Sequence, residues 1–149
     1  SSPFPLTAQN SRDATYAPKI RPQDAEIIAT EPALLIERKI RAYNPWPGAY
    51  IIITNYQLLI TNKPHGSNQQ TLRLKIWKAE IKKDANASLA IQTSFKNISL
   101  YQKCPALICG DGKLLVLTHI QPEGKKRMSG EEFVRGYLQN FQFSSTNFQ

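Results

Sequence analysis

The length, composition and charge of this chain exclude several classes of protein. Its 149 residues fit one domain with an attached linker, and a hydrophobic fraction of 41 % is sufficient for a packed core, which excludes overall disorder. The net charge of +8 favours a polyanionic partner, a nucleic acid or an anionic membrane surface, and no apolar run approaches the roughly 18 residues of a membrane span.

Residues 1–29 are predicted to form an interdomain linker, and residues 30–149 a single domain. Pro18 and Pro22 would interrupt any helix in the first segment. Its apolar residues are too scattered to form a core of their own.

A helix is predicted over residues 32–42, because proline is tolerated in the first turn and Thr30 or Glu31 can cap its start. Arg38 and Arg41 lie mostly off the apolar face, where they could contact phosphate or simply be solvated. The residues of that face recur at helical spacing: Ala33, Ile36, Ile40 and Tyr43.

A rigid connector follows this helix and consists of Asn44, Pro45, Trp46, Pro47 and Gly48. Each proline fixes its own φ near about −65° and disfavours a helical conformation for the residue before it, so the helix should end by residue 43. Gly48 has no Cβ and permits the close approach of another segment. We expect Trp46 to be buried at a structural corner, without a catalytic role.

The segments after the connector predict β-strands. Residues 49–53 form a short apolar run, and the turn residues before position 71 predict a hairpin whose long loop exposes His65 to solvent. Residues 72–81 form the clearest strand. The apolar side chains of this strand switch from even-numbered to odd-numbered positions near Trp77. Such a switch of the buried face predicts a bulge or a barrel corner.

Basic residues are interleaved with Trp77 along this second strand. Such a pattern suits a nucleic-acid surface, and edge-strand lysines that prevent aggregation are the alternative. The basic residues are Arg73, Lys75, Lys78, Lys82 and Lys83.

Further strands are predicted around residues 89–95 and 98–100. Residues 106–109 and 113–120 flank Gly110, Asp111 and Gly112, which predicts a tight hairpin rather than a phosphate or metal site.

A final helix is predicted after the basic run Lys125, Lys126 and Arg127. Ser129 and Glu132 match a capping box, and apolar residues follow at helical spacing. The amides of a helix N-terminus attract anions, so this run is a candidate phosphate contact, with a solvated charge run as the alternative.

The sequence shows no active site and no metal site. Cys104 and Cys109 have no partners at metal-ligand spacing, His119 lies far from Asp111, and no glycine-rich phosphate loop or nucleophile elbow occurs. Two cysteines without a disulfide framework and the lack of a secretory pattern at the first residues favour a cytoplasmic location. We therefore expect a binding module.

Five stretches resemble the methionyl-tRNA formyltransferase family in the family's order. They are residues 14–20, 37–50, 76–79, 110–112 and 121–128, and the second contains the Asn-Pro-Trp-Pro-Gly connector. The resemblance covers residues 14–138 and corresponds to the linker and C-terminal domain. It implies a mainly β fold, an open Greek-key β-barrel resembling an OB-fold, with a helix before the first strand and a C-terminal helix.

The resemblance also implies an activity and partners. The family transfers a formyl group from 10-formyltetrahydrofolate to the methionyl amino group of initiator tRNA in translation initiation. An N-terminal Rossmann-like domain carries the Asn, His and Asp catalytic set. None of these residues matches a position here, so we expect this chain to be inactive alone and to bind no cofactor. We also expect a monomer. The expected tRNA-binding residues are Arg38, Arg41, Arg73, Lys75, Lys78, Lys82, Lys83, Lys125, Lys126 and Arg127.

Two alternatives stay open at this point. The chain could be the C-terminal domain of a sugar-nucleotide formyltransferase, or a structural module that only docks the catalytic domain. The basic charge and the Gln-Pro-Glu-Gly-Lys-Lys run favour the tRNA enzyme.

Overall fold

One antiparallel sheet organises the part of the chain that the computed structural model describes, namely residues 8, 10–54, 71–86, 91–92 and 98–138. Within these residues the strand order is β1-β2-β6-β5-β4-β3, and β7 pairs with β6. The strands are β1 (Tyr50–Thr54), β2 (Thr71–Asn86), β3 (Ile91–Gln92), β4 (Ser99–Tyr101), β5 (Cys104–Ile108), β6 (Lys113–Pro122) and β7 (Met128–Ser129).

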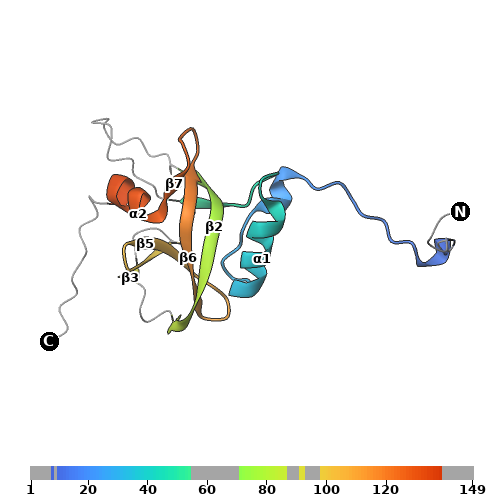
Figure 1. Ribbon diagram of the computed structural model, residues 1–149, viewed down its shortest axis with the longest axis horizontal. Coiled ribbons are helices and arrows are strands. Elements are labelled where there is room, and N and C mark those ends of the chain that lie inside the picture. Colours follow the sequence, from blue (N-terminus) through green and yellow to red (C-terminus); the bar gives the residue numbers. More distant parts are fainter. Residues whose placement is uncertain (1–7, 9, 55–70, 87–90, 93–97, 139–149) are drawn as a thin grey trace, which may run out of the picture.

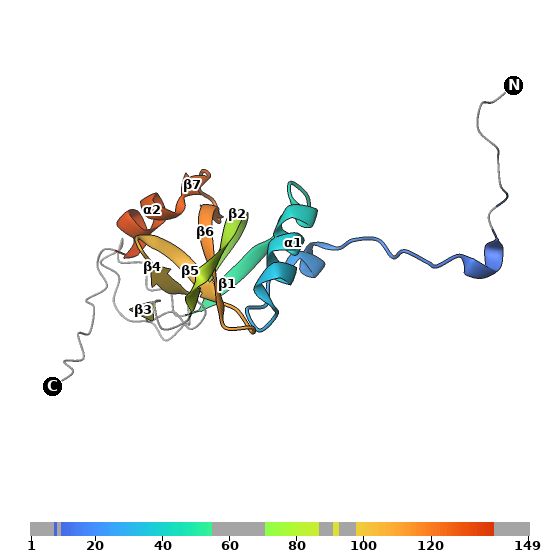
Figure 2. The ribbon, with the colours of Figure 1, turned by 60° about the horizontal axis from the view of Figure 1, so that its bottom comes forward.

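The prediction of a mainly β fold is confirmed. In the described residues, however, the sheet runs from β1 to β3 without a pairing that would close it into a barrel. Short helices flank the strands, with α1 and α2 on opposite sides of them (Figures 1 and 2). The helices are α1 (Ala33–Tyr43), α2 (Gly130–Phe133), the 3-10 turns η1 (Ser11–Asp13) and η2 (Pro22–Ala25), and the π-helical turn η4 (Val134–Leu138).

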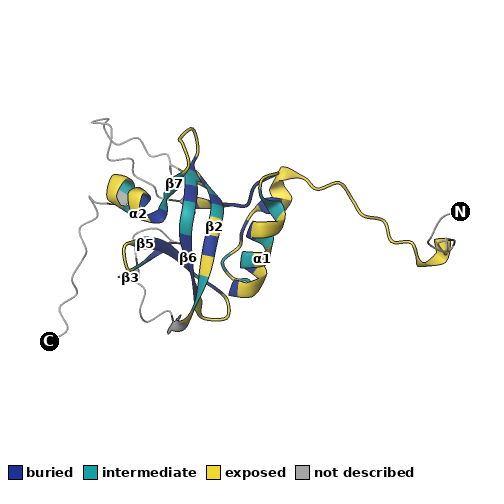
Figure 3. Cartoon of the chain, in the orientation of Figure 1, coloured by how far each residue is buried: buried dark blue, intermediate teal, exposed yellow. Residues whose placement is uncertain are grey.

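The N-terminal segment extends away from the sheet before it joins the core. Residues 10–21 are all exposed (Figure 3). Ala25 and Ile27 are buried, and the Ile27 amide donates a hydrogen bond to the Tyr50 carbonyl at 2.8 Å. The boundary between linker and domain at residue 29 stays a prediction.

One hydrophobic core joins α1, the sheet and α2. Ile36 and Ile40 of α1 are buried against strand residues such as Leu74 and Leu117, and Phe133 of α2 lies in the same cluster. Burying side chains of this size stabilises the fold by about 1.5–3 kcal/mol each, so this core holds both helices on the sheet.

The start of α1 is capped differently from the prediction. The helix begins at Ala33, within one residue of the predicted start, but neither Thr30 nor Glu31 caps it. The Ala33 amide instead donates to Oδ1 of Asp111, which lies in the turn between β5 and β6. That turn is the predicted hairpin, which the pairing of Ile108 with Leu114 confirms.

The predicted bulge in the second strand is also confirmed. The register between β2 and β6 shifts between Ile76 and Lys78, opposite Ile120 and His119. Trp77 is therefore the extra residue of a β-bulge. The buried positions change there from Leu74 and Ile76 to Ala79. The β1–β2 hairpin is present as well, but its loop with His65 lies outside the described residues, as does most of the strand predicted over 89–95.

The predicted burial of Trp46 is wrong. Its side chain is 65 % exposed, whereas the predicted end of the helix at residue 43 and the extended conformation of Asn44 are both confirmed. The connector is therefore a structural corner whose indole points to solvent. The peptide bonds preceding Pro45 and Pro47 are both cis.

Candidate nucleic-acid interface

Two basic residues of β2 lie on the face of the sheet opposite the core. Tyr50 pairs with Lys75, and Lys75 pairs with Gln121 on the other side, so these three side chains share one face. Arg73 lies two residues before Lys75 on the same face, while the intervening Leu74 is buried.

Arg73 is held by an aromatic ring. Its guanidinium carbon lies 3.6 Å from the ring centroid of Tyr50, whose side chain is only 6 % exposed. A cation over the face of an aromatic ring is attracted by the ring quadrupole, and poor solvation of the ring strengthens this attraction. The charge of Arg73 is thereby fixed in position on the surface.

Trp77 brings the β6–β7 turn to β2. The Lys75 Nζ and the guanidinium carbon of Arg127 lie 4.2 Å and 5.0 Å from its ring centroid. Its Nε1 donates to Oε1 of Gln121 at 2.9 Å, and the Gln121 Nε2 donates to the Lys125 carbonyl at 2.8 Å. The basic run 125–127, distant in sequence, is therefore tied beside the basic residues of β2.

The connector is also attached to this face. Asn44 Nδ2 donates to the carbonyls of Ile76 and Trp77 at 3.0 Å and 3.2 Å, and Lys75 Nζ donates to the Pro45 carbonyl at 3.1 Å. Gly48 has a φ of +93°, a backbone conformation that residues with a Cβ rarely adopt, and the end of the Lys75 side chain lies where a Cβ would be. The positive φ therefore favours glycine where the connector crosses β2.

A pocket of about 320 Å³ lies between the connector and the β6–β7 turn. Its wall includes glycines and prolines of the connector and the turn, the basic side chains of Arg73 and Lys75 from β2, and the carboxylate of Glu123 from the turn. Its lining residues are Pro47, Gly48, Tyr50, Arg73, Lys75, Gln121, Pro122, Glu123 and Gly124.

The structure divides the ten predicted basic residues into two groups. We define the cationic cluster as the basic residues that meet around Tyr50 and Trp77, together with the two lysines that precede Arg127 in the same turn. The cationic cluster consists of Arg73, Lys75, Lys125, Lys126 and Arg127.

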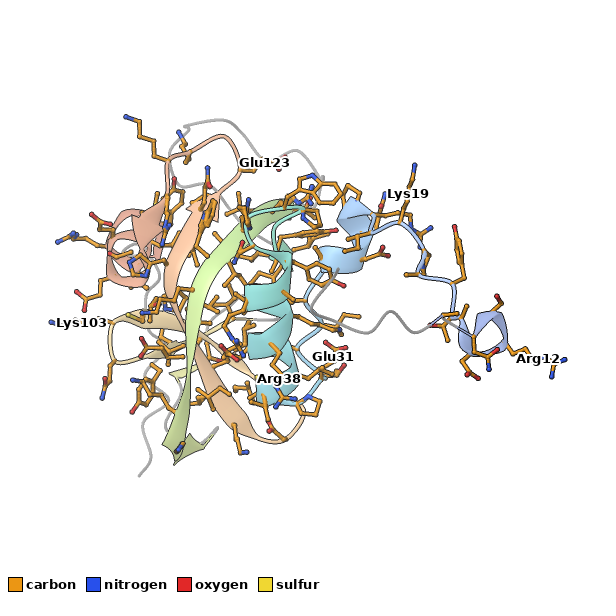
Figure 4. The ribbon with its side chains drawn as sticks, turned by 45° about the vertical axis from the view of Figure 1, so that its right-hand side comes forward. Arg12, Lys19, Glu31, Arg38, Lys103 and Glu123 are labelled. Carbon is orange, nitrogen blue, oxygen red and sulfur yellow. The ribbon has the colours of Figure 1, made fainter. Side chains whose placement is uncertain are left out.

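The remaining predicted residues lie elsewhere and are partly neutralised. Glu37 pairs with Arg41 at 2.6 Å, and its hydrogen bond and charge raise the pKa of Arg41. Glu80 pairs with both Lys78 and Lys82, at 3.7 Å and 3.6 Å. Arg38 and Lys83 are exposed without a contact to the cationic cluster. Figure 4 shows Arg38 on α1, toward the end of the sheet opposite Glu123.

Three pocket residues with polar side chains were not among the site residues predicted from the sequence. The pairing of β1, β2 and β6 brings these residues to the pocket, namely Tyr50, Gln121 and Glu123. The strand register that does so cannot be read from a single sequence. The alternation around Tyr50 could have suggested that its side chain shares a face with basic residues of a partner strand.

The cysteines are unsuited to nucleophilic chemistry. Burial, with a smaller effect of the Asp111 charge, raises the pKa of Cys109 to about 11, and burial also raises the pKa of Cys104. Both thiols are therefore protonated near neutral pH. In the described part of the chain, no three His, Cys, Asp or Glu side chains are grouped so as to hold a metal ion, and no helix is long and apolar enough to cross a membrane.

Residues 19–138 match the family described as formyl transferase, C-terminal domain. The match covers most of the chain, so this chain belongs to that family, which confirms the resemblance found in the sequence.

Relatives of the chain include methionyl-tRNA formyltransferases. The enzyme of Symbiobacterium thermophilum is 36 % identical over 132 residues, covering 89 % of this chain and 35 % of the relative. That of Bacillus pumilus is 35 % identical over 136 residues, covering 91 % of this chain and again 35 % of the relative. The chain thus spans about a third of the length of these relatives.

A solved structure shares the fold. HypX from Aquifex aeolicus superimposes with a TM-score of 0.51 at 13 % identity, covering 93 % of this chain and 22 % of HypX. At this identity the likeness concerns the fold alone.

Proposed function

We propose that this chain is the tRNA-binding C-terminal domain of a cytoplasmic methionyl-tRNA formyltransferase that acts in translation initiation. The names of the relatives support this assignment. The observation that carries it is the cationic cluster, in which residues from β2 and from the β6–β7 turn meet around two aromatic rings.

The cationic cluster suits the phosphate backbone of RNA. Arg73 and Arg127 form no hydrogen bond or ion pair with the described residues through their guanidinium groups, so their N–H donors are available to a ligand. Lys125 and Lys126 are exposed next to them. Contacts to phosphates depend little on the nucleotide sequence, so we assign initiator selectivity to parts of the protein outside this chain. Formyl transfer from 10-formyltetrahydrofolate is assigned there as well, because the family's catalytic residues have no match in this chain.

Charge reversal tests the proposal. Lys125→Glu, Lys126→Glu and Arg127→Glu together should weaken binding of initiator tRNA at moderate salt. They should also flatten the dependence of the logarithm of affinity on that of salt concentration, by about one unit for each lost phosphate contact. Filter binding between 50 and 300 mM salt, as an order-of-magnitude range, measures both quantities.

A second triple variant controls for total charge. Arg38, Lys83 and Lys103 are exposed and lie outside the cationic cluster, so their reversal to Glu changes the net charge equally. This control should retain most of the affinity. Equal loss in both triple variants would show a diffuse charge effect, and no loss in the first would refute the proposed function.

A second candidate function is docking of the N-terminal catalytic domain that the family resemblance implies. Leu34 and Leu35 are 48 % and 43 % exposed on α1, and Ile28 before the helix is 56 % exposed. Substitution of both leucines by Lys should weaken association with a separately produced catalytic domain while leaving tRNA affinity unchanged. Gel filtration of the mixed domains checks this outcome.

A further inference from the structure

The pocket beside the connector contains two cations and one carboxylate. Arg73 and Lys75 enter it from β2, and Glu123 enters it from the turn after β6. The Glu123 carboxylate forms neither a hydrogen bond nor an ion pair with any described residue, and its side chain is exposed. The three ionic groups therefore line one concave site without neutralising one another through direct contacts.

The two cations retain most of their hydrogen-bond donors. The guanidinium of Arg73 interacts with Tyr50 through the face of the ring, which leaves its N–H groups without a partner in the described structure. Lys75 uses its ammonium on the Pro45 carbonyl, and an ammonium has three donors. An anionic group such as a phosphate could therefore be bound by both side chains from adjacent positions on one strand.

The carboxylate restricts what kind of anion fits. Glu123 would repel a bare polyanion, but it would accept a hydrogen bond from a hydroxyl group of the same ligand. A nucleotide unit of RNA carries both a phosphate and a 2′-hydroxyl, and the pocket volume is at the lower end of the range for small-ligand sites. A pocket of this volume accommodates about one nucleotide unit.

Trp46 belongs to the connector that borders the pocket, between Pro45 and the lining residue Pro47. Its indole is 65 % exposed, yet its neighbours are fixed, because the Pro45 carbonyl accepts a hydrogen bond from Lys75 and Pro47 lines the pocket. An exposed indole on a rigid connector loses little conformational freedom when it stacks on a base. Its place on the connector, whose Pro45 carbonyl binds Lys75 and whose Pro47 lines the pocket, favours an unpaired RNA base over an apolar protein surface as its partner.

We propose that this pocket binds a single unpaired nucleotide of an RNA. Its phosphate is bound by Arg73 and Lys75, its 2′-hydroxyl donates to Glu123, and its base stacks on the exposed indole of Trp46. The inference rests on the proposed function and specifies which part of the RNA this end of the domain contacts.

Binding of short labelled oligonucleotides to the full chain tests the three roles separately. The probes are a ribo-tetranucleotide and the deoxyribo-tetranucleotide of the same sequence, followed by fluorescence anisotropy. Trp46→Ala should weaken binding of the ribo-probe roughly ten-fold with an unchanged salt dependence, because stacking displaces no counterions. Trp46→Phe should restore most of the affinity, because phenylalanine retains a stacking face.

The charged residues give different readouts. Arg73→Gln should weaken binding and reduce the salt dependence by about one unit, whereas Arg38→Gln, a matched change outside the pocket, should leave both unchanged. Glu123→Ala should abolish the preference for the ribo-probe over the deoxyribo-probe. A loss of charge repulsion alone would instead strengthen binding of both probes equally, and that result would overturn the role of Glu123.

These experiments distinguish a failure of the nucleotide-pocket proposal from a failure of the proposed tRNA-binding function. If Trp46→Ala and Arg73→Gln leave oligonucleotide binding unchanged while reversal of residues 125–127 still weakens tRNA binding, the nucleotide pocket is refuted and the proposed function stands. If the Trp46 variants weaken only association with the catalytic domain, the Trp46 indole is a protein contact and the proposal is wrong. Melting temperatures of every variant confirm that a loss of binding does not reflect unfolding.

Discussion

Oδ1 of Asp111 accepts a hydrogen bond from the backbone amide of Ala33 at 3.2 Å, across 78 positions of the sequence. The amide belongs to the first turn of α1, where no intrahelical partner exists for it. The same hairpin turn contributes a second link, because the Gly110 amide donates to the Glu31 carbonyl at 3.0 Å. The turn between β5 and β6 thus fixes where α1 begins and how it lies on the sheet.

Removal of the Asp111 carboxylate should lower the melting temperature by several degrees. Asp111→Ala leaves the Ala33 amide without its acceptor, whereas Asp111→Asn retains an acceptor oxygen and should show a smaller loss. Asp13→Ala provides a control, because that carboxylate lies in the exposed N-terminal segment. Thermal unfolding followed by circular dichroism measures the differences, and an equal effect of the Asp111 and Asp13 variants would contradict the capping role.

The contribution of Asp111 should also depend on pH. Burial raises the pKa of Asp111, but hydrogen bonds from the amides of Ala33 and Lys113 and the Lys113 charge outweigh it, so the pKa lies below its usual 3.8. A carboxyl whose pKa is lowered by folding stabilises the fold above its unfolded pKa, and this stability is lost as the pH falls through the folded value. The difference in melting temperature between the native chain and Asp111→Ala should therefore be constant from neutral pH to about pH 5 and shrink below pH 4.

Gly110→Ala should destabilise the domain by about 1–3 kcal/mol. A Cβ at this position would overlap the backbone carbonyl of Thr30, so the hairpin turn would have to move away from the start of α1. Gly136→Ala is the matched control, since a Cβ there meets no atom within 4 Å. Urea unfolding of both variants gives the free energies, and equal values for the two would show that the hairpin turn is not packed as described.

The features that the sequence predicted are those set by neighbouring residues. The end of α1 before Pro45, the hairpin around Asp111 and the capping box of Ser129 and Glu132 each depend on a few consecutive positions. The cap that Asp111 supplies to the Ala33 amide joins residues 78 positions apart. It depends on how the hairpin packs on the helix, and a local sequence pattern does not contain this information.

The composition of the candidate site was predictable only in part. The sequence identified the basic residues, but the selection of Arg73, Lys75 and Arg127 from the others depends on the strand register and on rings such as that of Trp77. The exposure of Trp46 was likewise not predictable from its residue type. Its residue type favours burial, yet its position on the connector leaves it exposed.

The capping box at α2 should contribute stability that disappears in acid. The Glu132 carboxylate accepts a hydrogen bond from the Ser129 amide at 2.7 Å, and this bond, supported by the Ser129 hydroxyl, lowers the pKa of Glu132 below its usual 4.5. Ser129→Ala should cost about 1 kcal/mol at neutral pH. Because the folded pKa of Glu132 is the lower one, Glu132→Gln should destabilise the domain above about pH 5 and progressively less below pH 4. Chemical unfolding at pH 7 and pH 3.5 compares the two variants, and a loss from Glu132→Gln that is independent of pH would contradict the role of the charge.

Trp46 and Phe133 should respond oppositely to truncation, although both are large aromatic residues. Phe133 is 1 % exposed and stacks on Tyr137 with ring centroids 4.9 Å apart, so Phe133→Ala should lower the free energy of unfolding by about 3–5 kcal/mol. Trp46 is 65 % exposed, so Trp46→Ala should change it by less than about 0.5 kcal/mol. Urea unfolding of both variants followed by circular dichroism makes the comparison. A large loss for Trp46→Ala would show that the indole packs on the domain in solution, and stability close to that of the native chain would leave its exposed ring available to a partner.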